Sequence, residues 1–402
     1  MKCKLSDIAV VTMGQSPKGD TYNKNGDGMP FLQGNRTFGD RYPTFDTWTT
    51  SPTKIAEAGD VIMSVRAPVG DLNITSVQMC LGRGVCSIRA INGNQDFIYY
   101  LMKYSIEQLL SKESGTVFGS VNRNDINGLD LDIPEDSVIQ QKIARYLTAI
   151  DEKIEVNKQI NENLEQQAVL LFRSWFTTFS QSESVVRQPS EFGQIPENFS
   201  IVKVGSLKML VTDYVANGSF ASLKENVTLY QEPNYAYFIR NTDLKSGSFE
   251  VFVDQHSYEF LSKSTLYGGE IIISNVGDVG SVFLCPKLDG PMTLGNNIIM
   301  LRPEDDSLRY YLYIWFKHLQ GQAIIQGIKG GSAQPKFNKT DFKNTSILLP
   351  PVELLSRFHD IVSPMFELIS RNQAENKRLS ALRDSLLPRL MSGELDVSSI
   401  DL

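Results

Sequence analysis

The sequence lacks the long apolar run that a membrane protein needs. None of its 402 residues belongs to a run approaching the roughly 18 apolar residues that cross a bilayer. The opening stretch, MKCKLSDIAV, lacks the apolar core of a secretory signal. These absences predict a cytoplasmic protein with no membrane partner.

Cysteine and histidine are also scarce. The cysteines are Cys3, Cys80, Cys86 and Cys285, with no C-x-x-C spacing, and there are only 3 histidines. A zinc site therefore has no support, and free, mostly buried thiols in a reducing compartment are expected.

Motifs for nucleotide chemistry are missing as well. The chain has neither a G-x-x-x-x-G-K-[ST] loop nor a G-x-G-x-x-G turn after a strand, and no Asn-Pro-Pro-aromatic stretch. Asp130 and Asp132 alternate with apolar residues and would share one strand face, either as a metal pair or, the favoured interpretation, as a solvated surface. The sequence predicts no catalytic residue, no bound metal and no bound cofactor.

Positive charge is not in excess. The net charge is -7, which argues mildly against nucleic-acid binding. The charges are unevenly placed, however, because acidic residues crowd the helical stretches while lysines and arginines fall in glycine-containing parts of the first half. One face of an acidic protein can still be basic.

What the sequence does have is a long amphipathic stretch from Val138 to Phe176 with no glycine or proline. Seven-residue spacing gives two apolar rows, Ile143, Ile150, Asn157, Leu164 and Leu171, and Leu147, Ile154, Asn161, Ala168 and Trp175. This periodicity is typical of a coiled-coil seam. Ser137 and Gln140 have the S-x-x-Q spacing of a capping box, so the helix is predicted over 137–176.

A second stretch, Val352 to Leu390, repeats the pattern near the end of the chain. Its rows are Phe358, Met365, Asn372, Leu379 and Leu386, and Val362, Ile369, Asn376, Arg383 and Leu390. A constant shift of 215 positions places Asn157 on Asn372 and Asn161 on Asn376. Because a seam asparagine needs a polar partner, we predict an antiparallel coiled coil whose register is set by facing asparagines. The alternative is that each helix packs on its own domain, with the asparagines in solvent.

The rest of the chain is also a repeat. AGDVIMSVRAPVGD (58–71) resembles GGEIIISNVGDVGS (268–281), and CLGRGVCSIRA (80–90) resembles TLGNNIIMLRP (293–303), each reading as strand, turn, strand. Helical stretches follow at 96–112 and 308–325, and then 114–134 matches 329–350. The predicted domains are therefore 1–136, a helix over 137–176, a linker over 177–198, a second domain over 199–350, and a helix with a tail over 351–402.

These features together resemble the specificity subunit of a type I restriction-modification system. The most telling pieces are MGQSPKGDTYNKNGDGMPFLQGNRTFGD (13–40), RAPVGDLNIT (66–75), GRGVCSIR (82–89), the run from IPEDSVIQQ into the central helix, and GGSAQPKFNKTDFKNTSILLPPVE (330–353). The Glu-Gln pair that usually follows the last Pro-Pro is missing. Here Leu354-Leu355 follows Glu353.

The resemblance implies an α+β protein with two globular α/β target recognition domains in a pseudo-twofold arrangement, joined by two long helices that form an antiparallel coiled coil. It also implies a noncatalytic role in phage defence. Each domain would read half of an asymmetric bipartite site in double-stranded DNA. The coiled coil would set the spacing and dock two modification (methyltransferase) subunits, with restriction (motor-nuclease) subunits added. S-adenosylmethionine, ATP and Mg would then be bound by those partners.

Candidate DNA-reading residues follow from side-chain chemistry, since Arg and Lys suit guanine edges, Asn and Gln suit adenine edges, and Lys suits phosphates. In the first domain they are Gln15, Ser16, Lys18, Gln33, Asn35, Arg36, Arg66 and Arg83. In the second they are Arg240 and Asn241, which follow YAYFI much as Asn35 and Arg36 follow PFLQG, together with Asn275, Lys329, Gln334, Lys336 and Asn338.

Two other functions compete with this interpretation. One is a coiled-coil protein-interaction scaffold without DNA specificity, which fits the acidic balance. The other is a nuclease or methyltransferase acting alone, for which the sequence has no motif.

Overall fold

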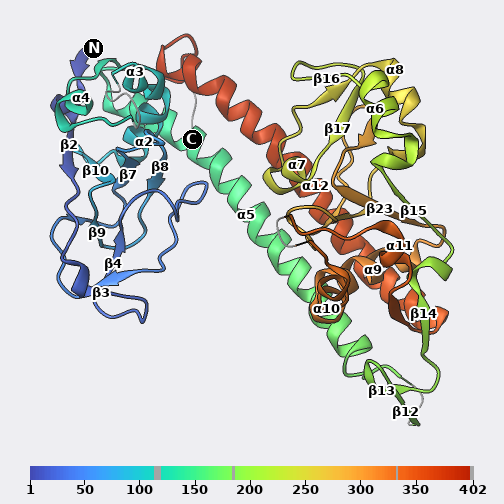
Figure 1. The fold of residues 1–402 in the computed structure, drawn as a ribbon. Coiled ribbons are helices and arrows are strands. Elements are labelled where there is room, and N and C mark those ends of the chain that lie inside the picture. The colour runs from blue at the N-terminus through green and yellow to red at the C-terminus, as the bar shows by residue number, and fades with distance from the viewer. Residues whose placement is uncertain (113–118, 183–185, 332–333, 399–402) are drawn as a thin grey trace. The chain divides into compact units, whose positions relative to one another are not determined.

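A computed structural model describes residues 1–112, 119–182, 186–331 and 334–398. The chain divides into two compact units: unit 1 is Met1–Asn157 with Glu375–Leu402, and unit 2 is Lys158–Ala374. Two long helices, α5 (Ser137–Phe176) and α12 (Val352–Met391), are drawn in green and red in Figure 1. Each unit therefore contains one half of each long helix.

Unit 1 contains a four-stranded sheet in the order β2-β10-β7-β8, a five-stranded sheet in the order β3-β5-β4-β9-β6, and the pair β1-β11. Among the described strands of this unit, β4 and β9 are the one pair that runs parallel. The strands are β1 (Lys2–Lys4), β2 (Ala9–Met13), β3 (Tyr22–Asn23), β4 (Met29–Leu32), β5 (Trp48–Thr49), β6 (Ile55–Ala56), β7 (Val61–Ser64), β8 (Leu72–Ile74), β9 (Met79–Leu81), β10 (Val85–Ala90) and β11 (Asp130–Asp132). The short helices are α1 (Leu5–Ile8), α2 (Gln95–Tyr104), α3 (Ile106–Leu110) and α4 (Arg123–Asn127).

Unit 2 repeats this strand order. Its sheets are β15-β23-β20-β21, β16-β18-β17-β22-β19 and β14-β24, and β17 and β22 are again the parallel pair. The strands are β14 (Ser200–Lys203), β15 (Met209–Asp213), β16 (Leu229–Tyr230), β17 (Ala236–Ile239), β18 (Phe252–Val253), β19 (Thr265–Leu266), β20 (Ile271–Ser274), β21 (Val282–Leu284), β22 (Met292–Leu294), β23 (Ile298–Pro303) and β24 (Ser346–Leu349). The helices are α6 (Phe220–Asn226), α7 (Asn241–Ser246), α8 (Gln255–Phe260), α9 (Ser307–Lys317), α10 (Leu319–Ile328) and α11 (Lys339–Lys343).

The repeat predicted from sequence is therefore confirmed in the strand order of both units. Each predicted helical stretch is divided in two, into α2 and α3 in unit 1 and α9 and α10 in unit 2. In unit 2 the break falls at His318, whose backbone is extended with φ -114° and ψ 177°. The predicted match between 114–134 and 329–350 includes residues 114–118 and 332–333, which lie outside the described residues.

The N-terminal cap of α5 differs from the prediction. Asp136, not Ser137, is the capping residue, because its Oδ1 accepts a hydrogen bond from the Val138 amide at 2.8 Å. Gln140 uses its side-chain amide to donate to the Pro134 carbonyl at 2.8 Å, so the predicted S-x-x-Q capping box does not form. A carboxylate one residue earlier in the chain takes the capping position.

The predicted seam of α5 and α12 is confirmed, since every residue in its four rows is buried or half-buried. In unit 1, Asn157 Nδ2 donates to Asn376 Oδ1 at 2.8 Å and to Glu375 Oε2 at 2.7 Å. In unit 2, Asn372 Nδ2 donates to Asn161 Oδ1 at 2.8 Å. The asparagines therefore face one another in crossed pairs, as antiparallel helices require.

Apolar packing fixes the half-helices to each unit. In unit 1, Ile143 and Leu147 of α5 and Leu387 and Leu390 of α12 belong to the same core as α2 and the four-stranded sheet. In unit 2, Phe172 and Phe176 of α5 pack on Tyr311 of α9, and Phe358 of α12 packs on Phe176 with ring centroids 5.0 Å apart. The predicted α+β fold class, with two globular units and antiparallel long helices, is confirmed.

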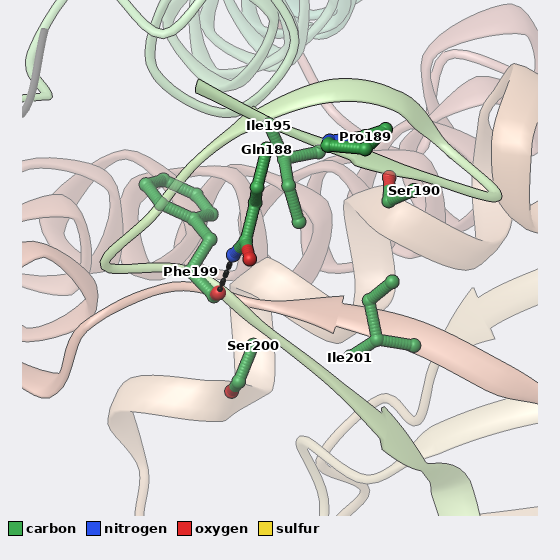
Figure 2. A pocket seen from close by; sticks show the side chains of 7 residues that line it. All are labelled: Gln188, Pro189, Ser190, Ile195, Phe199, Ser200 and Ile201. Carbon is green, nitrogen blue, oxygen red and sulfur yellow. Dashed lines mark hydrogen bonds between the residues drawn. The ribbon is translucent and has the colours of Figure 1, made fainter. Parts of the chain in front are cut away.

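The segment predicted as a linker, 177–198, contains structure of its own. The strands β12 (Arg187–Ser190) and β13 (Gly193–Pro196) form an antiparallel hairpin, and Ile195 is 1% exposed in the core of unit 2. Figure 2 shows this part of the chain, where Gln188 Nε2 donates to the Phe199 carbonyl at 3.2 Å. A polar composition did not reveal the hairpin because few of its residues are buried.

The seam asparagines generate a test of stability. Replacing Asn157 alone by leucine leaves the side-chain oxygen of Asn376 without the Asn157 donor. Replacing both residues by leucine removes that oxygen as well, so no acceptor is left unpaired at this position. A double-mutant cycle on the unfolding free energy, measured by urea denaturation, should give a coupling of roughly 1–3 kcal/mol. The double variant should be at least as stable as the single variant. The same cycle at Asn161 and Asn372 is the companion in unit 2, and additive effects at both pairs would contradict the facing-asparagine register.

Candidate nucleic-acid interface

Three loops of unit 1 converge where their strands end. The Gln15 amide donates to the Leu81 carbonyl at 2.9 Å, the Gly82 amide to the Leu32 carbonyl at 2.8 Å, and the Gly84 amide to the Gln33 carbonyl at 3.0 Å. The loops after β2 and β4 are therefore tied through backbone bonds to the turn between β9 and β10.

This approach requires glycine. A Cβ at Gly82 would lie 2.6 Å from the Gln33 Cα, and a Cβ at Gly14 would lie 2.0 Å from the Gly82 carbonyl oxygen. Both distances are shorter than any real Cβ contact, so the loops are held together by backbone packing. Side chains on this frame are free to vary without changing it.

Polar side chains predicted as DNA readers meet on this frame. Ser16 Oγ donates to Gln33 Oε1 at 2.9 Å and accepts bonds from the Arg83 amide at 3.2 Å and from Arg83 Nε at 3.3 Å. Gln15, Gln33 and Arg83 are exposed and Ser16 is half-buried. The structure thus brings together four predicted residues from three separate loops.

Arg66 belongs to a fourth loop beside this group. The amide of the preceding Val65 donates to the Gly84 carbonyl at 2.9 Å, and Arg66 forms a backbone bridge with Ser120. The side chains of Arg66 and of Lys18, which lies further along the β2 loop, are exposed and have no ion pair within the described residues. Both cations are available to an anionic ligand.

Arg36 is exposed and Asn35 is half-buried, but each has an acidic partner. Asn35 Nδ2 donates to Asp71 Oδ2 at 2.5 Å, and Arg36 Nη2 donates to both oxygens of Asp46 at 2.7 and 2.8 Å. The hydrogen bond from Arg36 lowers the pKa of Asp46 below its ordinary value. The charge of Arg36 is therefore balanced in the free protein.

Unit 2 repeats part of this backbone frame. The Gly295 amide donates to the Ile239 carbonyl at 2.8 Å, the Asn275 amide to the Asn297 carbonyl at 3.1 Å, and the Phe337 amide to the Asn275 carbonyl at 3.0 Å. Since Leu32 pairs with Leu81 and Ile239 with Leu294, the two sheets share a register. Arg240 thus occupies the position of Gln33, which corrects the predicted correspondence of Arg240 with Asn35.

Arg240 and Asn241 are engaged within unit 2. Arg240 Nη2 donates to Asp243 Oδ1 at 2.6 Å, and the carboxylate of Asp243 is 4% exposed and caps α7. Asn241 Nδ2 lies 3.5 Å from Asp278 Oδ2, and Lys245 pairs with that carboxylate at 2.6 Å. The bond from Lys245 is the main cause of the lowered pKa of Asp278. The contacts of Arg240 stabilise the loop, so the Arg240 side chain is less available to a ligand than the side chain of Gln33.

The stretch from Lys329 to Asn338 folds back on itself. Gly330 and Lys336 exchange two backbone hydrogen bonds of 2.9 Å, and Lys336 also bridges Val276, the counterpart of Arg66. Lys329, Gln334 and Lys336 are exposed and without an ion pair among the described residues, and residues 332–333 lie outside that description. Asn338 instead caps α11 by accepting from the Asp341 amide at 2.8 Å, as Asn122 caps α4.

Sequence reasoning missed two residues at the centre of the unit 2 frame. Asn296 and Asn297 occupy the positions of Arg83 and Gly84 between β22 and β23, and both are exposed. Asn297 has φ 65°, a left-handed conformation that asparagine adopts more readily than most side chains. The alignment of LGNN with LGRG already places these two residues opposite Arg83 and Gly84.

Elsewhere the described residues hold no alternative chemical centre. No group of three or more His, Cys, Asp or Glu within them could hold a metal ion. The cysteines are free, as predicted, and burial raises the pKa of Cys86 to about 12. The carboxylates of Asp130 and Asp132 face solvent, as the favoured interpretation of that strand predicted. No helix in the described part of the chain is long and apolar enough to span a membrane.

The pocket drawn in Figure 2 lies beside the β12–β13 hairpin, away from these loops in sequence. It is lined by residues that carry no charge, namely Gln188, Pro189, Ser190, Ile195, Phe199, Ser200 and Ile201. Such a lining offers neither a cation for phosphate nor a carboxylate for proton transfer.

Comparison with known proteins agrees with this arrangement. The family model for the type I restriction modification DNA specificity domain matches residues 1–166 and 211–383. The MjaIX type I restriction enzyme specificity subunit of Methanocaldococcus jannaschii is 27% identical over 423 aligned residues, covering 99% of this chain and 94% of that protein. A protein of the same organism named for the MjaX type I restriction enzyme is 37% identical over 158 residues, covering 39% of this chain but only 37% of that protein.

A solved structure has the same fold. The crystal structure of the type I restriction-modification S subunit from M. genitalium superposes with a TM-score of 0.60, with 16% sequence identity, over 99% of this chain and 96% of that one. The class that these findings define is a specificity protein built from two related recognition units. The chain belongs to the type I restriction modification DNA specificity domain family. A coiled-coil scaffold without DNA specificity is not favoured.

The glycine frame generates a test. Gly82→Ala should lower the unfolding free energy by about 1–3 kcal/mol, because the added Cβ meets backbone atoms of Leu32 and Gln33 that cannot move away. Gly19→Ala is the matched control, since a Cβ there meets nothing within 4 Å. Urea denaturation of the two variants should separate them, and equal stabilities would show that the loops are not held by backbone contact.

Proposed function

We propose that this chain is the DNA-recognition subunit of a type I restriction-modification complex. Each unit would read one half of a bipartite target in double-stranded DNA through its loop frame. The observation that supports this most is that much of one backbone frame occurs twice with different side chains. Gln33 and Arg83 in unit 1 correspond in position to Arg240 and Asn296 in unit 2.

The two half-sites are therefore expected to differ. Arginine forms two hydrogen bonds with the major-groove edge of guanine, and asparagine does so with adenine. Arg83 thus favours a guanine in the half-site of unit 1, while Asn296 favours an adenine in the half-site of unit 2. Lys18 and Arg66 in unit 1 and Lys329 and Lys336 in unit 2 are proposed to contact phosphates, which position the protein without reading sequence.

The paired halves of α5 and α12 are proposed to set the spacing of the half-sites and to dock two modification subunits, with restriction subunits added to the complex. A pseudo-twofold arrangement of the recognition units would address half-sites about one helical turn, roughly 34 Å, apart. The chain itself would be noncatalytic and cytoplasmic, with S-adenosylmethionine, ATP and Mg bound by its partners.

Methylation of genomic DNA tests the base readers. The chain is co-expressed with the modification subunit encoded beside it, and the methylated sites are sequenced. A single split motif is expected. Arg83→Asn should change the preferred base in one half only, and Asn296→Arg should change it in the other half only. The original residue at each position is expected to favour its base roughly tenfold or more over the other bases. Wild-type cells without a split motif would contradict the proposed function.

Salt dependence tests the phosphate contacts. The logarithm of the binding constant of the complex for its target should fall steeply with the logarithm of salt concentration. Lys18→Ala and Arg66→Ala should each reduce that slope by about 0.9, because each removes one released counterion. Arg36→Ala is the matched control, because its charge is already balanced by Asp46, and it should change the slope less. Equal slopes for all three variants would remove Lys18 and Arg66 from the interface.

A further inference from the structure

Unit 1 contains a buried charged cluster that the proposed recognition does not use. Arg41 lies in the long loop between β4 and β5, yet its side chain is only 7% exposed. Its Nη1 lies 3.6 Å from Asp151 Oδ2 of α5 and donates to the Tyr100 hydroxyl at 3.3 Å. Asp151 is 8% exposed and also accepts from Arg383 Nη1 of α12 at 2.7 Å.

Aromatic rings close the cluster. The Arg41 guanidinium lies 5.5 Å from the ring centroid of Tyr99 and 5.8 Å from that of Tyr42. Tyr100 donates its hydroxyl hydrogen to Asp151 Oδ2 at 2.7 Å, and burial raises its pKa well above the ordinary value. Nη2 of Arg41 reaches Asp96 at 3.4 Å. The guanidinium is thus held by α2 and by α5, and Asp151 connects it to Arg383 of α12.

The loop that Arg41 anchors begins at the reader frame. It starts at Gln33, includes Asn35 and Arg36, and reaches β5 at Trp48 without a helix. Between its ends, the Arg41 carbonyl accepts from the Ile74 amide at 2.7 Å. Arg41 therefore joins the backbone of this loop to the helix pair of the same unit.

Among the residues that the structure describes, unit 2 shows no such anchor. Its equivalent loop contains α7 and is stabilised internally by Arg240 and Asp243. The helix position that matches Asp151 in the repeat is Phe366, which stacks on Tyr310 with ring centroids 4.6 Å apart and planes 6° apart. An apolar contact replaces the ionic one, so the charged cluster is particular to unit 1.

We propose that Arg41 is a positioning residue for DNA reading by unit 1: it fixes the 33–47 loop on α2 and α5, so that discrimination in one half-site alone depends on it. This rests on the proposed function. Burying an ion pair adds little net stability, but its directional contacts specify one geometry, whereas an apolar side chain in the same space would allow the loop to shift. Asp151 keeps Tyr100 and Arg383 as partners when Arg41 is removed, so the fold should survive.

Arg41→Met in the complex with the modification subunit tests this inference. Methylation at sites with a single mismatch should rise roughly tenfold when the mismatch lies in one half-site, with the other half-site unchanged. The matched control is Arg89→Met, which also takes an arginine from a buried carboxylate of unit 1, Asp60 at 2.7 Å, but at the end of β10 away from the loop frame. It should leave discrimination unchanged in both halves.

The outcomes are distinguishable. Equal loss of discrimination in both halves, or the same behaviour of Arg41→Met and Arg89→Met, would overturn the role of Arg41 while a split wild-type motif would still support the proposed function. If Arg41→Met fails to fold, Arg41→Lys keeps the charge but lacks the planar fork that contacts Tyr100, Asp96 and Asp151 together. Partial loss in one half only is then expected, and wild-type discrimination by the lysine variant would overturn the proposal.

Discussion

The structure depends on how two long amphipathic helices bury their apolar stripes. A helix of 40 residues with one apolar face is stable only where other elements cover that face. In each unit, half of α5 and half of α12 cover one another and share a core with the sheet and helices of that unit. Unit 1 therefore combines residues from both ends of the sequence, whereas unit 2 is the continuous segment Lys158–Ala374.

Polar groups decide which alignment of the stripes is used. Leucine, isoleucine and alanine rows slide past one another at modest cost, but an asparagine or aspartate amid them needs its own partner. Asn157 with Asn376, and Asn372 with Asn161, satisfy this requirement in their respective units, and Asp151 with Arg383 adds an ionic partner in unit 1. These pairs lower stability relative to a wholly apolar seam and make one register preferred.

The loop frames follow a different principle. Their geometry comes from backbone hydrogen bonds and from glycines that let chains touch, as at Gly82 in unit 1 and Gly295 in unit 2. Because the frame does not use the side chains that project from it, those side chains can change while the loop geometry is kept. A protein that must recognise varied DNA sequences benefits from this separation. The 33–47 loop of unit 1 is long and contains no helix, and the Arg41 side chain supplies a contact that fixes it.

Much of this architecture was available from the sequence. The heptad rows, the matching asparagines and the repeated glycine turns predicted the long helices, their antiparallel pairing and the duplicated strand order, because such patterns depend on spacing along the chain. The alignment also contained Asn296, although its importance was not recognised. The capping aspartate and the hairpin in 177–198 were missed because several local patterns compete there with similar strength.

Only the tertiary structure decided which side chains are free and which are already engaged. The sequence does not distinguish the arginines at 36, 66, 83 and 240. In the structure, Arg36 forms an ion pair with Asp46 and Arg240 forms one with Asp243. Arg83 donates a hydrogen bond to Ser16, and Arg66 is unpaired among the described residues. In the sequence Arg41 counted only as one of the basic loop residues of the first half that could form a basic face, yet it is almost wholly buried. The sequence determined which elements form, through periodicity and glycine placement. The fold determined what each charge contacts, because the backbone conformation decides whether a nearby carboxylate such as Asp46 or Asp243 is reached, and partners such as Ser16 and Asp151 lie far from Arg83 and Arg41 along the chain.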